Sequence, residues 1–346
     1  MTTDFHHYLL EEANKAMPTH TLLAQELLTL LPQSKANIYK KIKGEVPFSA
    51  LEAIAIARKF GISLDRFIHN GHSDFEKVSF DYSLPQHQPH SPAAFLEKVR
   101  LDLERIVKIP QVCIHYASNE VPLFHSLTCR NLLAFKLYVW SRTNWKCPDM
   151  PNVAFDVEAF YALWPDVEKH RQAIASLYRQ IPSKEYWSRT VLDNILNQIR
   201  YYTEAKFFKD PGMPEMLLAE LRQILDTSAF LAAEGTKGAP DPTAPAASFE
   251  LFLNEIAYTN NIILIYSAKR PIGVYATMDN PNFLRCVDPV FCQRMHLWIK
   301  QVEECSFHVS SEQHRLSLFR DLYEKVKMAG VGSTTSSSFF ATVASH

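Results

Sequence analysis

The N-terminal fold is decided by the stretch Ser34-Lys-Ala-Asn-Ile-Tyr-Lys-Lys-Ile-Lys-Gly44 and by Leu51-Glu-Ala-Ile-Ala-Ile-Ala-Arg-Lys-Phe-Gly61, which follows shortly after it. The first opens on a serine that can cap a helix, and both close on a glycine, which accepts a positive φ at a helix end. These signals predict one short helix over 35–43 and another that Pro47 and Ser49 open and Gly61 ends.

Three more short helices are predicted around this pair. The first runs from about Asp4, a plausible N-cap, to Met17, where Pro18 stops it. The second covers 21–30 with a leucine-rich face, and the last covers 64–68. Residues 1–70 are therefore expected to form a five-helix domain whose order and helix lengths fit a helix-turn-helix module.

The predicted helix over 35–43 carries four lysines and no acidic residue. Ile38 and Ile42 are four residues apart, so both can anchor one face of the helix to a core. The remaining side chains then suit a helix in the major groove, where Asn pairs with adenine and Lys reaches guanine or phosphate. The candidate DNA-contacting residues are Ser34, Lys35, Asn37, Tyr39, Lys40, Lys41 and Lys43.

Residues 20–70 resemble the lambda-repressor-like helix-turn-helix domains of the bacterial Cro and xenobiotic-response-element class. The matching stretches are 23–28 (Leu-Ala-Gln-Glu-Leu-Leu), 34–44 and 51–65 (ending Gly-Ile-Ser-Leu-Asp). One departure is Leu30-Leu-Pro-Gln33, which stands where the family has a glycine-containing turn. The resemblance implies sequence-specific binding of double-stranded DNA by a larger bacterial transcriptional regulator whose C-terminal region is uncharacterised.

Charge limits how such a protein could bind DNA. The 346 residues include 37 acidic and 36 basic side chains, which excludes a uniformly basic nucleic-acid coat protein. Residues 1–70 are themselves nearly neutral, so one copy would neutralise few phosphates. We therefore expect a homodimer that contacts two half-sites about one helical turn apart.

The rest of the chain is predicted to be a Pro-, His- and Gln-rich linker over 71–92, a larger domain over 93–330 and a disordered tail over 331–346. The larger domain is expected to be mostly helical α+β with a small β-hairpin or sheet, which makes the whole chain mainly α. Its predicted helices cover 93–108, 131–142, 155–180, 185–209, 213–232, 288–304 and 312–328. Its predicted strands cover 112–116, 121–127, 261–267 and 272–278.

The common catalytic motifs are absent from the sequence. It has no GxSxG, HExxH, Walker or GxGxxG motif, so no enzyme activity, catalytic residue, cofactor or metal is expected. Two groups of residues are kept as less favoured candidates for a metal site. One is His115 and His125 with Glu120 between them, and the other is Cys292 with His296. The six cysteines form no CxxC pair and are expected to be reduced and mostly buried.

No apolar stretch is long enough to span a membrane, and residues 1–7 do not have the pattern of a signal peptide, so a cytoplasmic protein without membrane contact is expected. The leading hypothesis is a DNA-binding transcriptional regulator whose residues 93–330 mediate association and sense an unknown small-molecule or protein effector. The alternative is a protein-interaction adaptor whose N-terminal helices are a degenerate bundle. A steep salt dependence of binding would distinguish the first from the second.

Overall fold

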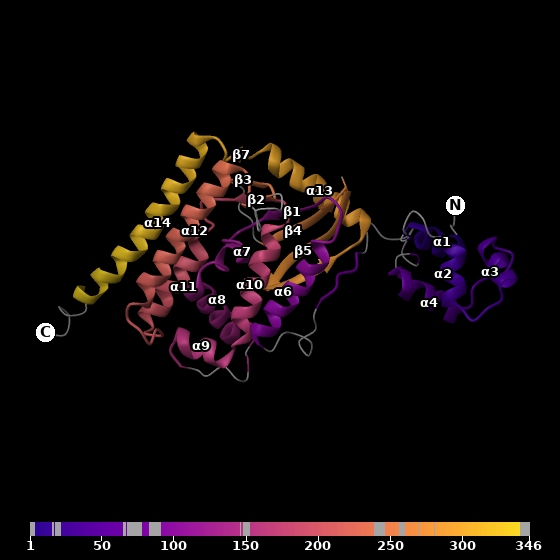
Figure 1. Cartoon of the computed structure of the whole chain (residues 1–346), viewed down its shortest axis with the longest axis horizontal. Coiled ribbons are helices and arrows are strands. Elements are labelled where there is room, and N and C mark those ends of the chain that lie inside the picture. Colours follow the sequence, from indigo (N-terminus) through magenta and orange to yellow (C-terminus); the bar gives the residue numbers. More distant parts are fainter. Residues whose placement is uncertain are drawn as a thin grey trace. The chain divides into compact units, whose positions relative to one another are not determined.

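The computed structural model describes residues 4–15, 17, 22–64, 67, 78–82, 91–145, 147, 153–238, 246–255, 260–268, 270–279 and 281–339. The chain divides into two compact units, Met1–Ser79 and Phe80–His346 (Figure 1). The boundary between them falls inside the range 71–92 that was predicted as a linker.

The first unit contains short helices around a small apolar core. They are α1 (Phe5–Lys15), α2 (Leu23–Leu30), α3 (Lys35–Ile42) and α4 (Ala50–Phe60). Their predicted caps are confirmed: Ser34 caps α3, Ser49 caps α4, and Gly61 ends α4 with a φ of 67°. Residues 65, 66 and 68 of the predicted fifth helix lie outside the described residues. The core is formed by fully buried side chains from all four helices, Leu9, Leu27, Ile38 and Ile56.

The second unit is built on a seven-stranded mixed sheet with the order β6-β5-β4-β1-β2-β3-β7. The parallel strands are β1 (Val112–Ala117), β2 (Ser183–Trp187) and β3 (Phe249–Leu253). An antiparallel meander follows on one side, comprising β4 (Ile262–Ser267), β5 (Arg270–Asp279) and β6 (Asn282–Cys286). The short β7 (Phe307–His308) pairs antiparallel with β3 at the other edge.

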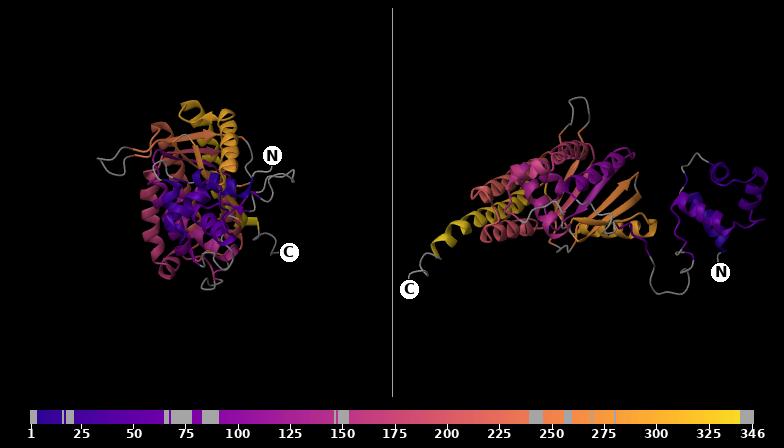
Figure 2. Two further views of the ribbon diagram at one scale, coloured as in Figure 1. Left: turned by 90° about the vertical axis from the view of Figure 1, so that its right-hand side faces the viewer. Right: turned by 90° about the horizontal axis from the view of Figure 1, so that it is seen from below.

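Helices cover both faces of this sheet, most of them on one face (Figure 2). Side chains alternate along β2, so Tyr186 packs in the cluster with Ile299 of α13 (Pro289–Glu304), whereas Trp187 belongs to the larger core on the opposite face. The helices of the larger core are α6 (Pro92–Ile106), α7 (Leu123–Ser126), α8 (Arg130–Thr143), α9 (Val157–Leu163), α10 (Asp166–Arg179), α11 (Asp193–Glu204), α12 (Met213–Glu234) and α14 (Glu312–Phe339). The opposite face is covered by α13 (Pro289–Glu304).

The structure corrects the prediction of a mainly α chain with a small β-hairpin or sheet. The fold is mixed α+β, because β2 and β3 join β1 and the meander in one sheet. The start of the predicted helix over 185–209 forms β2, and only its middle forms α11. Glu185, a good helix former, stands in this strand because its carboxylate has buried partners there, and no local pattern predicts those.

Three other boundaries also differ from the prediction. The predicted strand over 121–127 is instead two residues without regular structure followed by α7 (Leu123–Ser126). The predicted helix over 155–180 is two helices, because Trp164 precedes a proline and leaves the helical conformation, with a φ of −129° and a ψ of 74°. The tail predicted to be disordered from 331 continues α14 to Phe339, and residues 340–346 lie outside the described residues.

A polar cluster lies inside the larger core of the second unit. Glu185 is 0% exposed and accepts hydrogen bonds from His125 Nε2 at 2.9 Å, from Trp187 Nε1 at 2.9 Å and from the Tyr178 hydroxyl. Burial alone would raise the pKa of Glu185, but His125 and the Tyr178 hydroxyl together hold it below its usual value. The cluster therefore contains a buried carboxylate that is ionised near neutral pH.

Lys237 adds a second buried ionisable group beside this cluster. Its Nζ donates to the carbonyl oxygens of Tyr178 at 3.0 Å and Ile181 at 2.7 Å and lies 3.2 Å from the centre of the Tyr178 ring. Burial lowers the pKa of Lys237 to about 7, and Glu185 opposes that shift. Lys237 thus ties the segment that precedes β3 to the end of α10. Among the described helices, none combines the length and apolar character needed to cross a membrane.

Candidate nucleic-acid interface

The helices α2 and α3 meet through a four-residue turn, 31–34. Leu31 takes an extended conformation, with φ −108° and ψ 132°, and buries its side chain in the core. Ser34 then caps α3 by accepting a hydrogen bond from the Asn37 backbone N–H at 3.3 Å. A buried leucine therefore shapes this turn where the resembled family has a glycine.

The outer face of α3 carries most of the predicted contact residues. Ile38 is 0% exposed and anchors the inner face, as its spacing predicted. Tyr39 is 43% exposed and Asn37 is half-buried. The exposed polar side chains are Ser34, Lys35, Lys40 and Lys43. The structure brings these six predicted residues together on one accessible helix that carries no carboxylate.

Lys41 is a correction to the predicted set. It is 5% exposed, and its Nζ donates to Glu52 Oε2 at 3.0 Å and to the Pro47 carbonyl oxygen at 2.8 Å. Lys41 follows Ile38 by three residues and therefore lies on the inner face of α3. Its ammonium group also lies 5.5 Å from the centre of the Phe48 ring. Lys41 holds α3 to α4, and its buried ammonium group is not among the exposed lysines of α3.

Glu52 is the centre of the hydrogen-bond network behind α3. One carboxylate oxygen accepts from Lys41 and from the Ser49 backbone N–H at 2.7 Å, and the other accepts from Gln33 Nε2 at 2.6 Å. Burial would raise the pKa of Glu52, but the hydrogen bonds from the Ser49 backbone and Lys41 lower it below its usual value. A charged carboxylate therefore links the turn, α3 and α4.

The same network fixes the Asn37 side chain, because Asn37 Nδ2 donates to Gln33 Oε1. The amide that we expect to contact a base is thus held in one orientation by a neighbour anchored on Glu52. Glu52 is not among the residues predicted from the sequence. The signal was present, since Ser49 and Glu52 have the serine-x-x-glutamate spacing of a capping box, and the structure contains that box.

His6 fixes the C-terminal end of α3 from the other side. Its Nε2 lies 2.6 Å from the Lys41 carbonyl oxygen, and its Nδ1 lies 3.4 Å from the Phe48 backbone nitrogen. The ring also stacks on Phe48 with 4.7 Å between the ring centres. The His6 ring therefore joins α1 to the C-terminal end of α3 and to Phe48.

Neither alternative metal site is assembled. His125 bonds to Glu185 in the larger core, whereas His115 lies on the other face of the sheet beside Tyr186. Cys292 and His296 both lie buried on α13 beneath the sheet, with His296 stacked on Tyr266. Within the ranges that the structure describes, no three His, Cys, Asp or Glu side chains are grouped to hold a metal ion.

Comparison of the chain with models of known protein families, with curated proteins and with solved structures gives no significant match. The likeness of residues 20–70 to helix-turn-helix domains therefore stays a prediction that depends on the residues named for it.

Proposed function

We propose that the N-terminal unit binds double-stranded DNA by placing α3 in the major groove and that the protein is a transcriptional regulator. The observation that carries this proposal is the division of α3 into two faces. Ile38 and Lys41 hold the inner face to the unit, whereas Lys35, Lys40 and Lys43 are exposed on a helix without a carboxylate. Such a face attracts phosphates and can reach base edges.

The proposed mode of binding is as a homodimer. Three exposed lysines per copy give a small number of phosphate contacts, and two copies double it. Two recognition helices related by a two-fold axis require half-sites about 10 base pairs apart. Selection of binding sites from random DNA with the full-length protein tests this directly. Enrichment of an inverted repeat with that spacing supports the proposal, and no enrichment at low salt contradicts it.

Replacing Lys35, Lys40 and Lys43 together by alanine is expected to lower affinity for all DNA sequences, because each phosphate contact contributes about 0.9 to the salt slope. Since each of the two copies loses three lysines, the slope of log K against log salt falls by about 5. Fluorescence anisotropy over a salt series measures it. The matched control replaces Lys108, Lys169 and Lys300, which are exposed outside this unit and remove the same charge. An equal decrease of the salt slope in both triple variants would refute the proposed interface.

Asn37→Ala is expected to relax sequence preference at one position of each half-site and to leave the salt slope unchanged. A bidentate amide contact to adenine contributes about 1–3 kcal/mol of discrimination. Repeating the site selection with the variant measures the effect. Asn197→Ala is the control, because it removes an exposed amide side chain outside the N-terminal unit. An unchanged selected sequence for Asn37→Ala would mean that this residue does not contact a base.

A further inference from the structure

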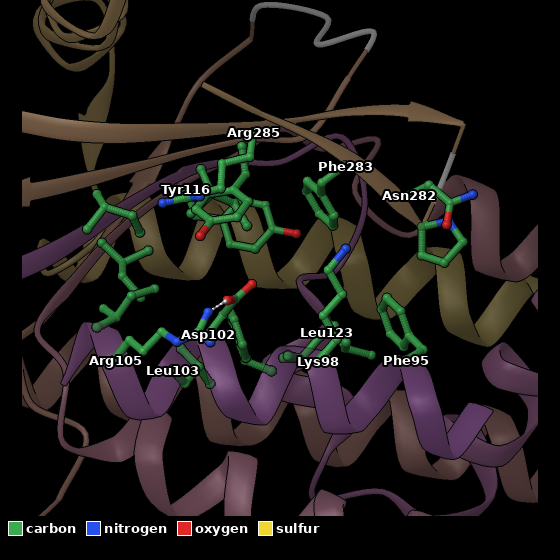
Figure 3. A pocket seen from close by; sticks show the side chains of 18 of the residues that line it. Phe95, Lys98, Asp102, Leu103, Arg105, Tyr116, Leu123, Asn282, Phe283 and Arg285 are labelled. Atoms are coloured by element: carbon green, nitrogen blue, oxygen red, sulfur yellow. Dashed lines mark hydrogen bonds and ion pairs between the residues drawn. The ribbon is translucent and has the colours of Figure 1, made fainter. Parts of the chain in front are cut away.

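A cavity of about 360 Å³ lies in the second unit between α6 and the sheet (Figure 3). Ile114 and Tyr116 of β1 and Ile263 and Ile265 of β4 line its sheet side. The strands β5 and β6 and the helix α7 complete the wall. Its volume falls within the range of about 300–1,000 Å³ in which proteins bind small molecules.

The helix α6 explains why this space is not filled. Leu96 is fully buried in the core, and α6 packs against α10. On the side that faces the sheet, Lys98 and Asp102 are one helical turn apart, and both rise from α6 toward the strands (Figure 3). Charged side chains therefore occupy positions where packing against the sheet would require apolar ones.

The wall of the cavity combines an apolar body with a few charged groups. Aromatic rings line much of it, from Phe95, Tyr116, Phe124, Tyr275 and Phe283. The charged side chains at the wall are Lys98, Arg105, Arg285, Asp81 and Asp102, three cations and two carboxylates. Both carboxylates have cationic partners, because Asp102 lies 3.4 Å from Arg105 and Asp81 lies 3.3 Å from Arg285. The three cations and two carboxylates give these lining side chains a net charge of +1.

Tyr275 provides a neutral donor close to these charges. Burial raises its pKa, Asp102 adds to that shift, and Arg285 opposes it. The hydroxyl therefore stays protonated at physiological pH. Aromatic rings, a phenolic donor and a net positive charge together favour a ligand with a flat apolar body and one anionic end.

We propose that this cavity binds a small aromatic monocarboxylate, with its ring among the aromatic side chains and its carboxylate toward Lys98 and Arg285. Asp81 and Tyr82 line the same cavity, and they follow the boundary of the first unit at residue 79 by two and three residues. A ligand here touches chain that is continuous with the N-terminal unit. The role of the ligand as an effector rests on the DNA-binding function proposed above, whereas its binding does not.

Isothermal titration of the full-length protein with 4-phenylbutyrate tests the binding site. The comparison compounds 4-phenylbutan-1-ol and 4-phenylbutylamine have the same ring and linker with a neutral or a cationic end. The acid is expected to bind at one site per chain and at least tenfold more tightly than the amine. Equal or tighter binding of the amine, or no binding of any of the three at millimolar concentration, would overturn the proposal.

Two pairs of variants place the probe in the cavity. Val99→Trp fills the space and is expected to weaken 4-phenylbutyrate binding at least tenfold, whereas Leu101→Trp, on an exposed position of α6, is expected to leave it unchanged. Lys98→Gln should lower the ratio of the affinity for 4-phenylbutyrate to the affinity for 4-phenylbutylamine. Lys108→Gln should leave this ratio unchanged. Thermal melts check that each variant is folded, and Ile263→Phe replaces Val99→Trp if that variant does not fold. Equal binding by a folded cavity-filling variant and by the Leu101 variant would place the probe elsewhere and refute the site.

The effector role has its own measurement. Adding 4-phenylbutyrate is expected to change the affinity of the full-length protein for its selected DNA by at least threefold, and the Val99→Trp variant should not respond. An unchanged affinity with a confirmed binding site would refute the effector role alone. Absence of any DNA binding would instead refute the proposed function, and the cavity titrations would still decide whether the site exists.

Discussion

Glu52→Ala is expected to unfold the N-terminal unit and to abolish the proposed DNA binding, although Glu52 lies on α4, outside the proposed recognition helix. The substitution leaves Lys41 Nζ buried with only the Pro47 carbonyl oxygen as a partner, and it also removes the acceptor of Ser49 and Gln33. Removing one partner of a buried ion pair costs about 3–5 kcal/mol. A unit of fewer than 80 residues rarely has more stability than that.

Hydrogen exchange followed by mass spectrometry measures this effect in the full-length protein. Amides of α2 to α4 should exchange at least about a hundredfold faster in Glu52→Ala, whereas those of the second unit should not change. All five tryptophans lie in the second unit, at 140, 145, 164, 187 and 298, so their fluorescence should also stay constant. Glu45→Ala, which removes an exposed carboxylate close to the end of α3, is the control.

A double variant separates the ion pair from a general packing effect. Lys41→Met with Glu52→Leu removes both charges and keeps similar volumes, so it should be more stable than Glu52→Ala alone. If the double variant is less stable than the single one, the uncompensated ammonium group is not the cause of the unfolding.

Glu185→Ala is expected to have the largest effect in the second unit. It removes the common acceptor of His125, Tyr178 and Trp187 inside a core where water is excluded. We expect a loss of at least about 3–5 kcal/mol in the free energy of unfolding, because three buried hydrogen-bond donors lose their common acceptor together. Urea denaturation followed by tryptophan fluorescence measures it, since Trp187 itself contacts Glu185.

The pH dependence of this effect has a definite sign. The folded-state pKa of Glu185 lies below its ordinary value of 4.5. Its stabilising contribution is therefore complete above that value and is lost as the pH falls through the folded-state pKa. The difference in stability between wild type and Glu185→Ala should increase as the pH falls through about 7, where Lys237 becomes charged beside Glu185, and should narrow as the pH falls below 4.5.

Glu250→Ala is the matched control for Glu185, because Glu250 lies on the neighbouring strand β3 with its partly exposed carboxylate 3.6 Å from Lys184. We expect it to cost less than about 1 kcal/mol. Similar losses in the two variants would show that the buried cluster contributes no more than an exposed ion pair.

The buried carboxylates of Glu52 and Glu185 also show which parts of the structure the sequence predicts and which it does not. The helices of the first unit follow from short-range signals, since Ser34, Ser49 and Gly61 each act within a few residues of their own position. The burial of Lys41 depends on Glu52, eleven residues away on another helix, so a pattern confined to α3 cannot distinguish it from Lys40.

Long-range partners account for the larger errors in the second unit. The pairing of β2 with β1 and β3 joins segments about 70 residues apart, and the hydrogen bonds of Glu185 come partly from His125, 60 residues away. A five-residue strand with two charged side chains carries no alternating apolar pattern that would identify it. The cavity was equally beyond prediction, since α6 and the meander that enclose it are separated by more than 150 residues.

The pairing of Asp81 with β6 limits how far the chain can be shortened from its N-terminal side. Its backbone pairs with Arg285 through two hydrogen bonds, of 2.7 and 3.0 Å, beside β6 at the edge of the sheet. Unpaired edge strands recruit strands from other molecules. A protein that begins at residue 78 keeps this cover, whereas one that begins at residue 83 exposes Arg285 and its neighbours in β6. We therefore expect the shorter version to self-associate and the longer one to stay dispersed.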